Sequence, residues 1–270
     1  MTSEEKLSNV IKNGIVLKRL LKLHHTPIGI ALGKTAPRGL LKLDGEMSFC
    51  KMWKMAFEGK AFFATAENHN CITGQYYLGF KKWRGKVCRF LVDEVQAYCN
   101  CDIADKHLKN VPKISKAKTG IICVAPLEKA NFFPNLILVR CRPEEAMLLF
   151  WTYSYATGET VKGETGTAIC VSLVIRPYLD GKPAFSLGDP GGRYIVGLDE
   201  NELVCSVPTR FFNGITETLR LHLKNWKAQS RGKGDVRLDS SSPSSARSPR
   251  AIMRYGRNLF YSAYTEASSG

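Results

Sequence analysis

Four segments of the chain place apolar residues at helical spacing. They lie at residues 3–24, 48–59, 143–158 and 208–226. Apolar side chains that recur every three or four residues are typical of a helix with one buried face. Ser48 is a favourable N-cap for the second segment, and Pro143 suits the first position of the third. A shorter helix is predicted to begin near Cys71.

Runs of apolar and β-branched residues predict strands between these helices. The strands are expected at residues 28–32, 61–65, 119–125, 135–141, 167–175, 194–198 and 203–207. In the clearest of them, residues 167–175, side chains alternate between two faces, and Cys170 lies on the face with smaller residues. The last two runs flank a polar turn and are expected to form a hairpin. This succession predicts an α/β (mixed α+β) fold, a mixed sheet packed with several helices.

The composition is sufficient for one hydrophobic core. The chain has 270 residues, of which 44% are hydrophobic, and this suits a single compact domain. We expect that domain to span residues 1–226. Residues 227–270 are rich in serine and basic residues and have no apolar periodicity, so they are predicted to form a disordered tail.

The net charge of +15 favours anionic partners. A solvated basic surface without a partner is the alternative. No nucleic-acid-binding module is recognisable, so we expect only non-specific contacts between the tail and nucleic acid. No apolar run is long enough to cross a membrane, and the N-terminal residues lack a signal sequence, which predicts a cytoplasmic protein. A small-molecule ligand is compatible with these features, and the oligomeric state is left open.

The chain contains nine cysteines. An odd number in a long chain argues against a secreted disulfide framework, so we expect reduced thiols. Cys123 and Cys205 lie in apolar runs and are expected to be buried packing residues. Cys99 and Cys101 are too close together for a two-cysteine metal knuckle, and we expect them at the surface.

Three other cysteines lie at positions that suit a reactive or metal-binding thiol. Cys50 falls in the first turn of one predicted helix and Cys71 at the start of another, where free N–H groups and the helix dipole favour a thiolate. Cys170 lies on the small-residue face of a predicted strand, which leaves space beside it. No CxxC pair accompanies them, so spacing alone does not indicate a metal site. From the residues alone, inert buried cysteines are the simpler interpretation.

A resemblance to a known family favours a functional site over inert buried cysteines more than the residues alone do. Residues 50–60 read Cys-Lys-Met-Trp-Lys-Met-Ala-Phe-Glu-Gly-Lys, followed by Phe63-Ala64-Thr65, Glu67, His69-Asn70-Cys71 and Gly74. Further agreement comes from Pro27-Ile28-Gly29-Ile30, Ala125-Pro126-Leu127, Gly181-Lys182-Pro183 and Ser186-Leu187-Gly188. Over residues 15–220 the chain resembles the domain of unknown function 169 family, also called ArCR, of archaea and anaerobic bacteria. The function of that family is not established, so the resemblance leaves open whether the chain is an enzyme.

The resemblance implies a site built on Cys50, Cys71 and Cys170. In the family a further cysteine often follows the Ser-Leu-Gly segment, and in this chain that position is Asp189. Three thiolates with one carboxylate or one open position suit an iron–sulfur cluster or a zinc ion. His69 is a ligand, a proton donor or a residue of a polar turn. The expected function is metal or cluster binding, with a redox or ligand-binding role.

The glycine-rich loop at residues 186–193 offers a second candidate site. Backbone N–H groups at Gly191 and Gly192 suit an anion nest, and Arg193 adds a charge suited to a carboxylate or phosphate. This alternative describes a non-catalytic module that binds a small anionic or flat aromatic ligand without a metal. A tight turn without a ligand explains the same glycines. The chain has no phosphate-loop, dinucleotide or nucleophile-elbow motif.

Overall fold

The computed structural model describes residues 2–81, 86–115, 119–166 and 168–231. The predicted tail, residues 227–270, lies outside this part of the chain except where the last helix continues to Arg231.

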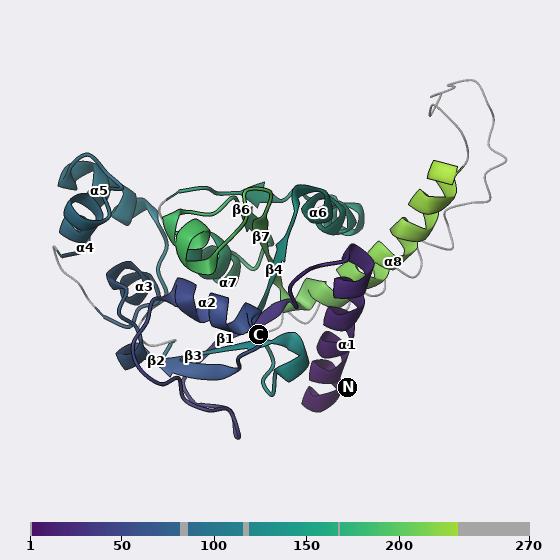
Figure 1. The fold of residues 1–270 in the computed structure, drawn as a ribbon, viewed down its shortest axis with the longest axis horizontal. Helices are drawn as coiled ribbons and strands as arrows, with labels where there is room; N and C mark the ends of the chain where they lie inside the picture. Colours follow the sequence, from purple (N-terminus) through teal and green to yellow (C-terminus); the bar gives the residue numbers. More distant parts are fainter. Residues whose placement is uncertain (1, 82–85, 116–118, 167, 232–270) are drawn as a thin grey trace.

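A seven-stranded sheet forms the centre of the described part (Figure 1). Its strands are β1 Ile28–Gly33, β2 Phe62–Thr65, β3 Ile121–Pro126, β4 Leu136–Cys141, β5 Lys162–Gly163, β6 Ala184–Ser186 and β7 Leu203–Pro208. Their spatial order is β2-β3-β1-β4-β7-β6-β5. Neighbouring strands are antiparallel except β5 and β6, which run parallel. The predicted mixed sheet is confirmed.

Helices cover both faces of this sheet (Figure 1). They are α1 Ser3–Leu21, α2 Phe49–Phe57, α3 Ile72–Tyr77, α4 Lys86–Arg89, α5 Cys101–Asn110, α6 Pro143–Thr157, α7 Arg176–Asp180 and α8 Thr209–Arg231. Helices α2, α3 and α7 lie on one face, and α1, α6 and α8 lie on the other. Helices α4 and α5 project as a small lobe, at the upper left of the view. Within the described residues, no helix is both long and apolar enough to cross a membrane.

Each face of the sheet buries its own core. On β4, Leu136 and Leu138 belong to the core under α2, whereas Ile137 and Val139 belong to the core under α6 and α8. This alternation follows from the pleat of the strand. Because both faces are covered, all six positions of β4 are buried, and the strand reads as a continuous apolar run. We call the two surfaces the α2 face and the α8 face.

Hydrogen bonds to the backbone fix two of the predicted helix boundaries. Ser48 Oγ accepts a hydrogen bond from Lys51 N–H at 3.2 Å, at the start of α2. Gly158 ends α6 with a φ of 72°, in the left-handed region that favours glycine. The local signals for these two helices are therefore confirmed.

The prediction of a strand over residues 167–175 is wrong. The chain is helical from Ile169 to Asp180, with a π-helical segment at Val171–Ile175. That segment is buried throughout, so it shows no helical periodicity, and a short apolar run of this kind fits a buried helix as well as a strand. Asp189 favours the helix, because its Oδ2 accepts a hydrogen bond from Ile169 N–H at 2.7 Å.

The predicted strand over residues 194–198 is also wrong. Gly191–Val196 forms a π-helical turn, and β7 pairs with β4 and β6 instead of with a hairpin partner. Asp189 Oδ1 accepts a hydrogen bond from Gly192 N–H at 2.6 Å, which caps the start of the turn. Gly197 ends it with a φ of 80°.

The lobe of α4 and α5 contains a disulfide that the sequence analysis missed. Cys88 and Cys101 are bonded to each other, within a small apolar cluster. The expectation of reduced thiols is therefore wrong for this pair, and Cys101 is half-buried rather than at the surface. Cys99 is exposed, as expected. A cluster this small has little apolar surface to bury, so a covalent link adds stability that packing cannot supply.

Candidate thiol site

The three predicted site cysteines lie on three separate helical segments of the α2 face. Cys50 is the second residue of α2, Cys71 is the N-cap of α3, and Cys170 lies in the first turn of the helix that leads into α7. Asp189 precedes the turn at Gly191–Val196. We call these four residues the thiol site.

The fold brings the four residues of the thiol site together. Cys50 Sγ lies 2.8 Å, and Asp189 Oδ1 lies 3.2 Å, from the point that a β-carbon on Gly191 would occupy. The absence of that β-carbon leaves room for both groups. Burial raises the pKa of the Cys170 thiol, and the neighbouring Cys50, Cys71 and Asp189 raise it further. Four groups that are distant in the sequence are therefore close enough to influence one another electrostatically.

Asp189 joins two of the helical segments. Its two carboxylate oxygens accept hydrogen bonds from the N–H groups of Ile169 and Gly192, and the side chain is buried. Hydrogen bonds to a carboxylate are among the stronger ones in proteins. Because Ile169 directly precedes Cys170, the first bond fixes where the Cys170 thiol lies. Asp189 therefore has a structural contact in the fold, and its role as a fourth ligand stays a prediction.

Cys71 makes local hydrogen bonds at the start of α3. Its Sγ accepts a hydrogen bond from Gly74 N–H at 3.4 Å and lies 3.0 Å from Thr73 Oγ1. Serine, threonine, aspartate and asparagine are the usual residues at such an N-cap. Sulfur is a weaker acceptor than oxygen, so helix capping alone does not account for a cysteine at this position.

Burial keeps the thiols of Cys50 and Cys170 protonated. Loss of hydration is the main cause of the raised pKa of Cys50, and the negative charge of Asp189 raises that pKa further. The backbone hydrogen bond at the start of α2 lowers it, but this contribution is the smallest. The predicted helix-start thiolate is therefore wrong for Cys50, because desolvation outweighs the helix N-terminus.

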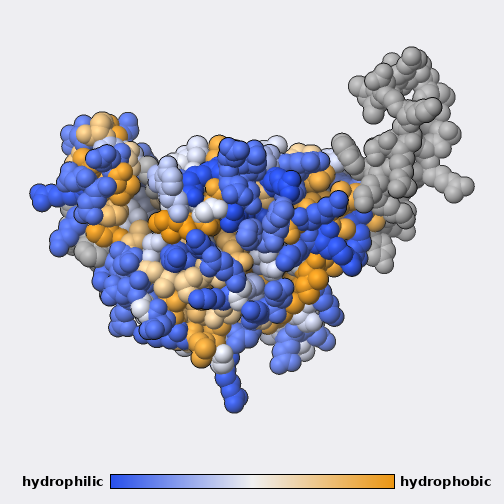
Figure 2. Space-filling view, in the orientation of Figure 1, coloured by the Kyte–Doolittle hydropathy of each residue, from blue (hydrophilic) through white to orange (hydrophobic). Residues whose placement is uncertain are grey.

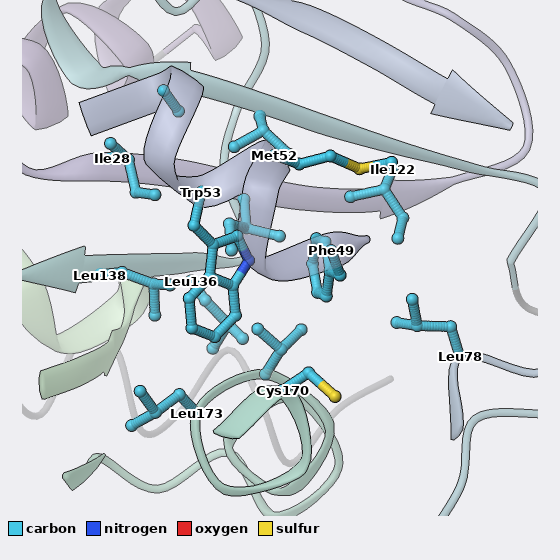
Figure 3. Packing of buried hydrophobic residues seen from close by; sticks show 14 of the residues in the cluster. Ile28, Phe49, Met52, Trp53, Leu78, Ile122, Leu136, Leu138, Cys170 and Leu173 are labelled. Atoms are coloured by element: carbon cyan, nitrogen blue, oxygen red, sulfur yellow. The ribbon is translucent and has the colours of Figure 1, made fainter. Parts of the chain in front are cut away.

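The surroundings of Cys170 are apolar (Figure 3). Phe49 and Trp53 of α2 belong to the same core as Cys170 and Leu78, and the two aromatic rings meet edge to face with centroids 5.3 Å apart. The indole N–H of Trp53 has no hydrogen-bond partner among the described residues. An apolar lining of this kind strengthens the electrostatic interactions between the groups of the thiol site.

The part of the chain that the structure describes contains no group of three or more His, Cys, Asp or Glu side chains arranged to hold a metal ion. A zinc ion binds sulfur at about 2.3 Å and therefore draws its thiolates to about 4 Å from one another. In an iron–sulfur cluster each cysteine binds a different iron atom, so the sulfur atoms lie further apart.

His69 is buried on the same face of the sheet. Neither ring nitrogen has a hydrogen-bond partner among the described residues, and the ring lies 5.8 Å from that of Phe49 and 5.0 Å from that of Phe80. Burial lowers the pKa of His69 to about 4, so the imidazole is neutral at pH 7. Its backbone is extended at the end of the 3₁₀ segment Ala66–Asn68 and forms an isolated bridge to Met47, and its carbonyl accepts a hydrogen bond from Gln75 Nε2. Its roles as a ligand or a proton donor stay predictions.

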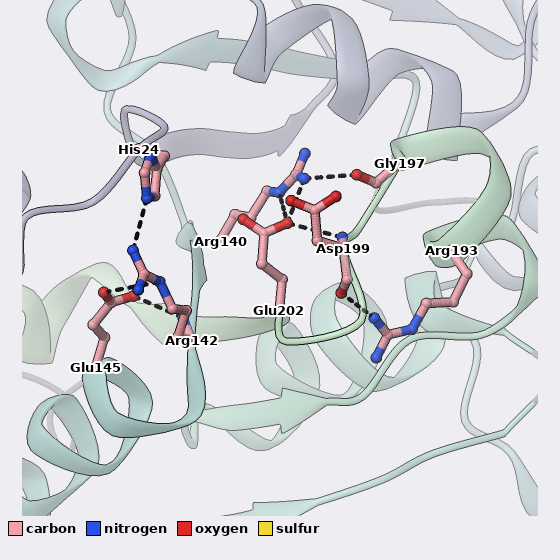
Figure 4. A network of polar contacts seen from close by, with 8 residues as sticks. All are labelled: His24, Arg140, Arg142, Glu145, Arg193, Gly197, Asp199 and Glu202. Carbon is pink, nitrogen blue, oxygen red and sulfur yellow. Dashed lines mark hydrogen bonds and ion pairs between the residues drawn. The ribbon is translucent and has the colours of Figure 1, made fainter.

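Arg193 contacts the protein itself. Its guanidinium donates hydrogen bonds to the carbonyls of Asp199 (Figure 4) and Leu187. The nearby N–H of Gly192 donates to Asp189. The glycine-rich loop therefore orders the thiol site, and the binding of an external anion by this loop stays a prediction.

A buried ion pair beside this loop was missed by the sequence analysis. Arg140 Nε donates a hydrogen bond to Glu202 at 2.7 Å, and Arg140 also donates to the carbonyl of Gly197 at 2.6 Å (Figure 4). Burial is the largest single influence on the pKa of Glu202 and would raise it, but the hydrogen bonds from Arg140 and from the Asp199 N–H, together with the charge of Arg140, outweigh burial and lower it. The signal in the sequence was an arginine inside an apolar strand, since a buried charge needs a partner.

The mixed sheet and the site on its covered face define this molecule as an α/β protein with a cluster of one buried and two half-buried cysteines. The chain belongs to the domain of unknown function 169 family, described as uncharacterised ArCR, whose family model matches residues 16–218. The matched residues include the whole thiol site, so the resemblance seen in the sequence is confirmed. No curated protein and no solved structure matches the chain.

Proposed function

We propose that the thiol site binds an iron–sulfur cluster through Cys50, Cys71 and Cys170, with a zinc ion as the less favoured occupant. The observation that supports this proposal is the convergence of three thiols and one carboxylate from separate segments of the α2 face, with Cys50 Sγ and Asp189 Oδ1 both beside Gly191 and with Cys50 and Cys71 neighbouring Cys170. Cysteines that serve only as small packing residues do not need to be grouped in this way.

The chemistry of the site favours a cationic occupant. Four groups that become negative on deprotonation lie near one another, and Asp189 and Cys71 oppose the ionisation of both Cys50 and Cys170. A bound metal centre reverses this effect, because thiolates are stabilised by the positive charge that they coordinate. Binding at this site therefore releases protons and weakens as the pH falls.

The residues of the site would have different roles. The three cysteines would supply the ligands, each from the start of a helix. Asp189 holds the Cys170 helix through its hydrogen bond to Ile169 and is the fourth candidate donor. A cluster with three thiolates and a labile fourth position lets one iron bind a small ligand, and cluster potential is set by charge and burial. A redox or ligand-binding role follows from this donor set.

Anaerobic reconstitution with ferrous iron and sulfide tests the proposal. The measured quantities are iron and acid-labile sulfide per chain, and visible absorbance. We expect the wild-type protein to take up both elements and become coloured. Cys50→Ser, Cys71→Ser and Cys170→Ser should each lose most of the bound iron, because each removes one ligand of the set.

Two other buried cysteines provide matched controls. Cys123→Ser and Cys205→Ser change thiols that lie in the strands β3 and β7, and they should bind as much iron as the wild type. Circular dichroism confirms that each variant is folded before it is scored. A wild-type protein that stays colourless and free of iron contradicts the cluster, and zinc bound in its place would select the second occupant. Equal loss of iron in all five variants would also contradict the proposed ligand set.

A further inference from the structure

A polar cleft of about 460 Å³ lies between the α5 lobe and the helix that carries Cys170. Its lining residues are His107, Asn110, Val111, Gly163, Glu164, Thr165, Gly166, Ala168, Val171, Ser172 and Arg176. Figure 2 shows the lobe as a separate projection at the upper left of the molecule. The volume falls in the range of pockets that bind small molecules.

This cleft is distinct from the thiol site. Val171, Ser172 and Arg176 line the cleft from the helical segment, and Ala168 lines it just before that segment begins. Cys170 lies between them in the sequence and on a different side, where it interacts with Cys50. A ligand in the cleft would therefore contact the same helix from the opposite direction.

Arg176 supplies the cleft with a fixed positive charge. Its Nε lies 2.7 Å from Glu164 Oε2, and its side chain is 32% exposed. A guanidinium has four N–H donors besides Nε–H, in a planar arrangement that matches a carboxylate. Although Glu164 lies within ion-pair distance, Arg176 Nε has no hydrogen-bond partner among the described residues, so the guanidinium offers hydrogen-bond donors to a carboxylate ligand.

His107 adds a neutral polar group to the opposite wall. Burial lowers the pKa of His107, and the charge of Arg176 lowers it further. Its Nε2 is buried and has no hydrogen-bond partner among the described residues. A ligand oxygen in the cleft would satisfy this nitrogen, while Val111 and Val171 offer apolar surface beside it.

The adjoining surface carries charges of both signs. A second cleft of about 300 Å³ shares Glu164, Ser172 and Arg176 with the first and is also lined by Lys162, Asp180 and Lys182. Lys182 is paired with Glu159 at 3.1 Å, so Arg176 is the basic group that the first cleft itself offers to an anion. We propose that the first cleft binds a small organic acid, with its carboxylate on Arg176 and a polar group directed to His107.

Binding of three acids and their amides tests this inference. Lactate, succinate and benzoate are titrated into the full-length protein and followed by ligand-observed NMR, with lactamide, succinamide and benzamide as neutral matches. We expect at least one acid to bind with a Kd below about 1 mM, and its amide to bind at least about tenfold more weakly, since charge-assisted hydrogen bonds are lost.

Two substitutions with opposite expected effects on affinity distinguish a role in ligand binding from a purely structural role. Arg176→Gln should weaken the acid at least about tenfold. Glu164→Gln should tighten it, because the guanidinium loses its competing carboxylate. A merely structural ion pair would not give opposite effects. Arg210→Gln is the control, since Arg210 lines a different cleft and donates to the carbonyl of Gly181.

Three outcomes would overturn the inference. They are no saturable binding of any of the three acids, equal binding of acid and amide, and acid binding that survives Arg176→Gln. The proposal does not depend on the iron–sulfur cluster. Cys170→Ser protein should bind the acid as the wild type does, so failure of one proposal is distinguishable from failure of the other.

Discussion

The two faces of the sheet both bury cysteines, but they do so in different ways. On the α8 face, the sulfur atoms of Cys141 and Cys205 lie 3.6 Å apart. These residues belong to β4 and β7, which are paired strands, so the register of the sheet alone brings the two thiols together. On the α2 face, the thiols come from separate helical segments, and no sheet register accounts for their convergence.

Buried polar groups are satisfied unevenly on both faces. On the α8 side, the hydroxyls of Thr152 and Thr216 donate hydrogen bonds to carbonyls of their own helices, at 2.6 Å and 2.9 Å, whereas His222 Nδ1 lacks a partner among the described residues. On the α2 side, the ring nitrogens of His69 and the indole N–H of Trp53 lack partners within the same part of the chain. Unpaired buried polar groups cost stability wherever they lie, so the two faces differ in how their thiols are brought together rather than in whether every polar group is paired.

The largest expected effect on the fold itself comes from Asp189→Ala. This change removes the two hydrogen bonds that the buried carboxylate accepts from the N–H groups of Ile169 and Gly192. We expect the free energy of unfolding to fall by about 4 kcal/mol, because each such bond to a charged group contributes about 2 kcal/mol and its loss leaves a buried donor. Urea denaturation followed by circular dichroism measures the change.

The control for Asp189→Ala lies on the other face. Thr216→Val removes one hydroxyl that bonds within α8 and should cost about 1 kcal/mol. If the two substitutions cost the same, Asp189 does not hold the thiol site together, and the contrast between the faces is weakened.

Part of this arrangement was predictable from the sequence. The helix at residues 48–59 and the strand at residues 135–141 were predicted correctly because their caps and their apolar runs are local signals. The helix at Ile169 was not predictable, since its start depends on Asp189, a residue twenty positions later in the chain. The Cys88–Cys101 disulfide was not predictable for the same reason, because its two cysteines lie 13 residues apart and only the fold brings them together. The cysteines of the site were found through residue chemistry and family resemblance, whereas their proximity required the fold.

His69 gives the next largest effect, through the dependence of stability on pH. Its pKa is lowered to about 4 in the folded protein, against about 6.5 for an unperturbed histidine. The unfolded state therefore binds more protons in this range, and stability that is present above pH 6.5 is lost as the pH falls to 4. The loss amounts to about 3 kcal/mol.

Substitution of His69 isolates this contribution. His69→Phe should flatten the decrease in the free energy of unfolding between pH 6.5 and pH 4, measured by urea titration at each pH. His24→Gln changes an exposed histidine and should leave the decrease as it is in the wild type. If the free energy of unfolding of His69→Phe falls with pH as steeply as that of the wild type, the imidazole of His69 is hydrated in solution. The α2 face would then resemble the α8 face.

The smallest effect is on thiol reactivity, and it compares Cys50 with Cys205. Burial raises the pKa of both thiols, but Cys50 is half-buried whereas Cys205 is fully buried. Alkylation by iodoacetamide requires both access and a thiolate. Mass spectrometry of the modified peptides, after short reactions from pH 7 to pH 10, gives the rate for each cysteine.

The alkylation rate of Cys50 depends on pH differently if solvent access alone limits it than if ionisation of the thiol also limits it. An ordinary thiol is largely ionised by pH 9.5, so its rate levels off. With its raised pKa, folded Cys50 should still react about tenfold faster for each pH unit between 9 and 10, and in urea its rate should level off instead. Cys205 should stay unmodified throughout in the folded protein. A plateau for folded Cys50 near pH 9 would mean that its thiolate is not disfavoured by Asp189 and desolvation. The two faces would then differ only in solvent access, and the argument for a cation-binding site would lose its electrostatic basis.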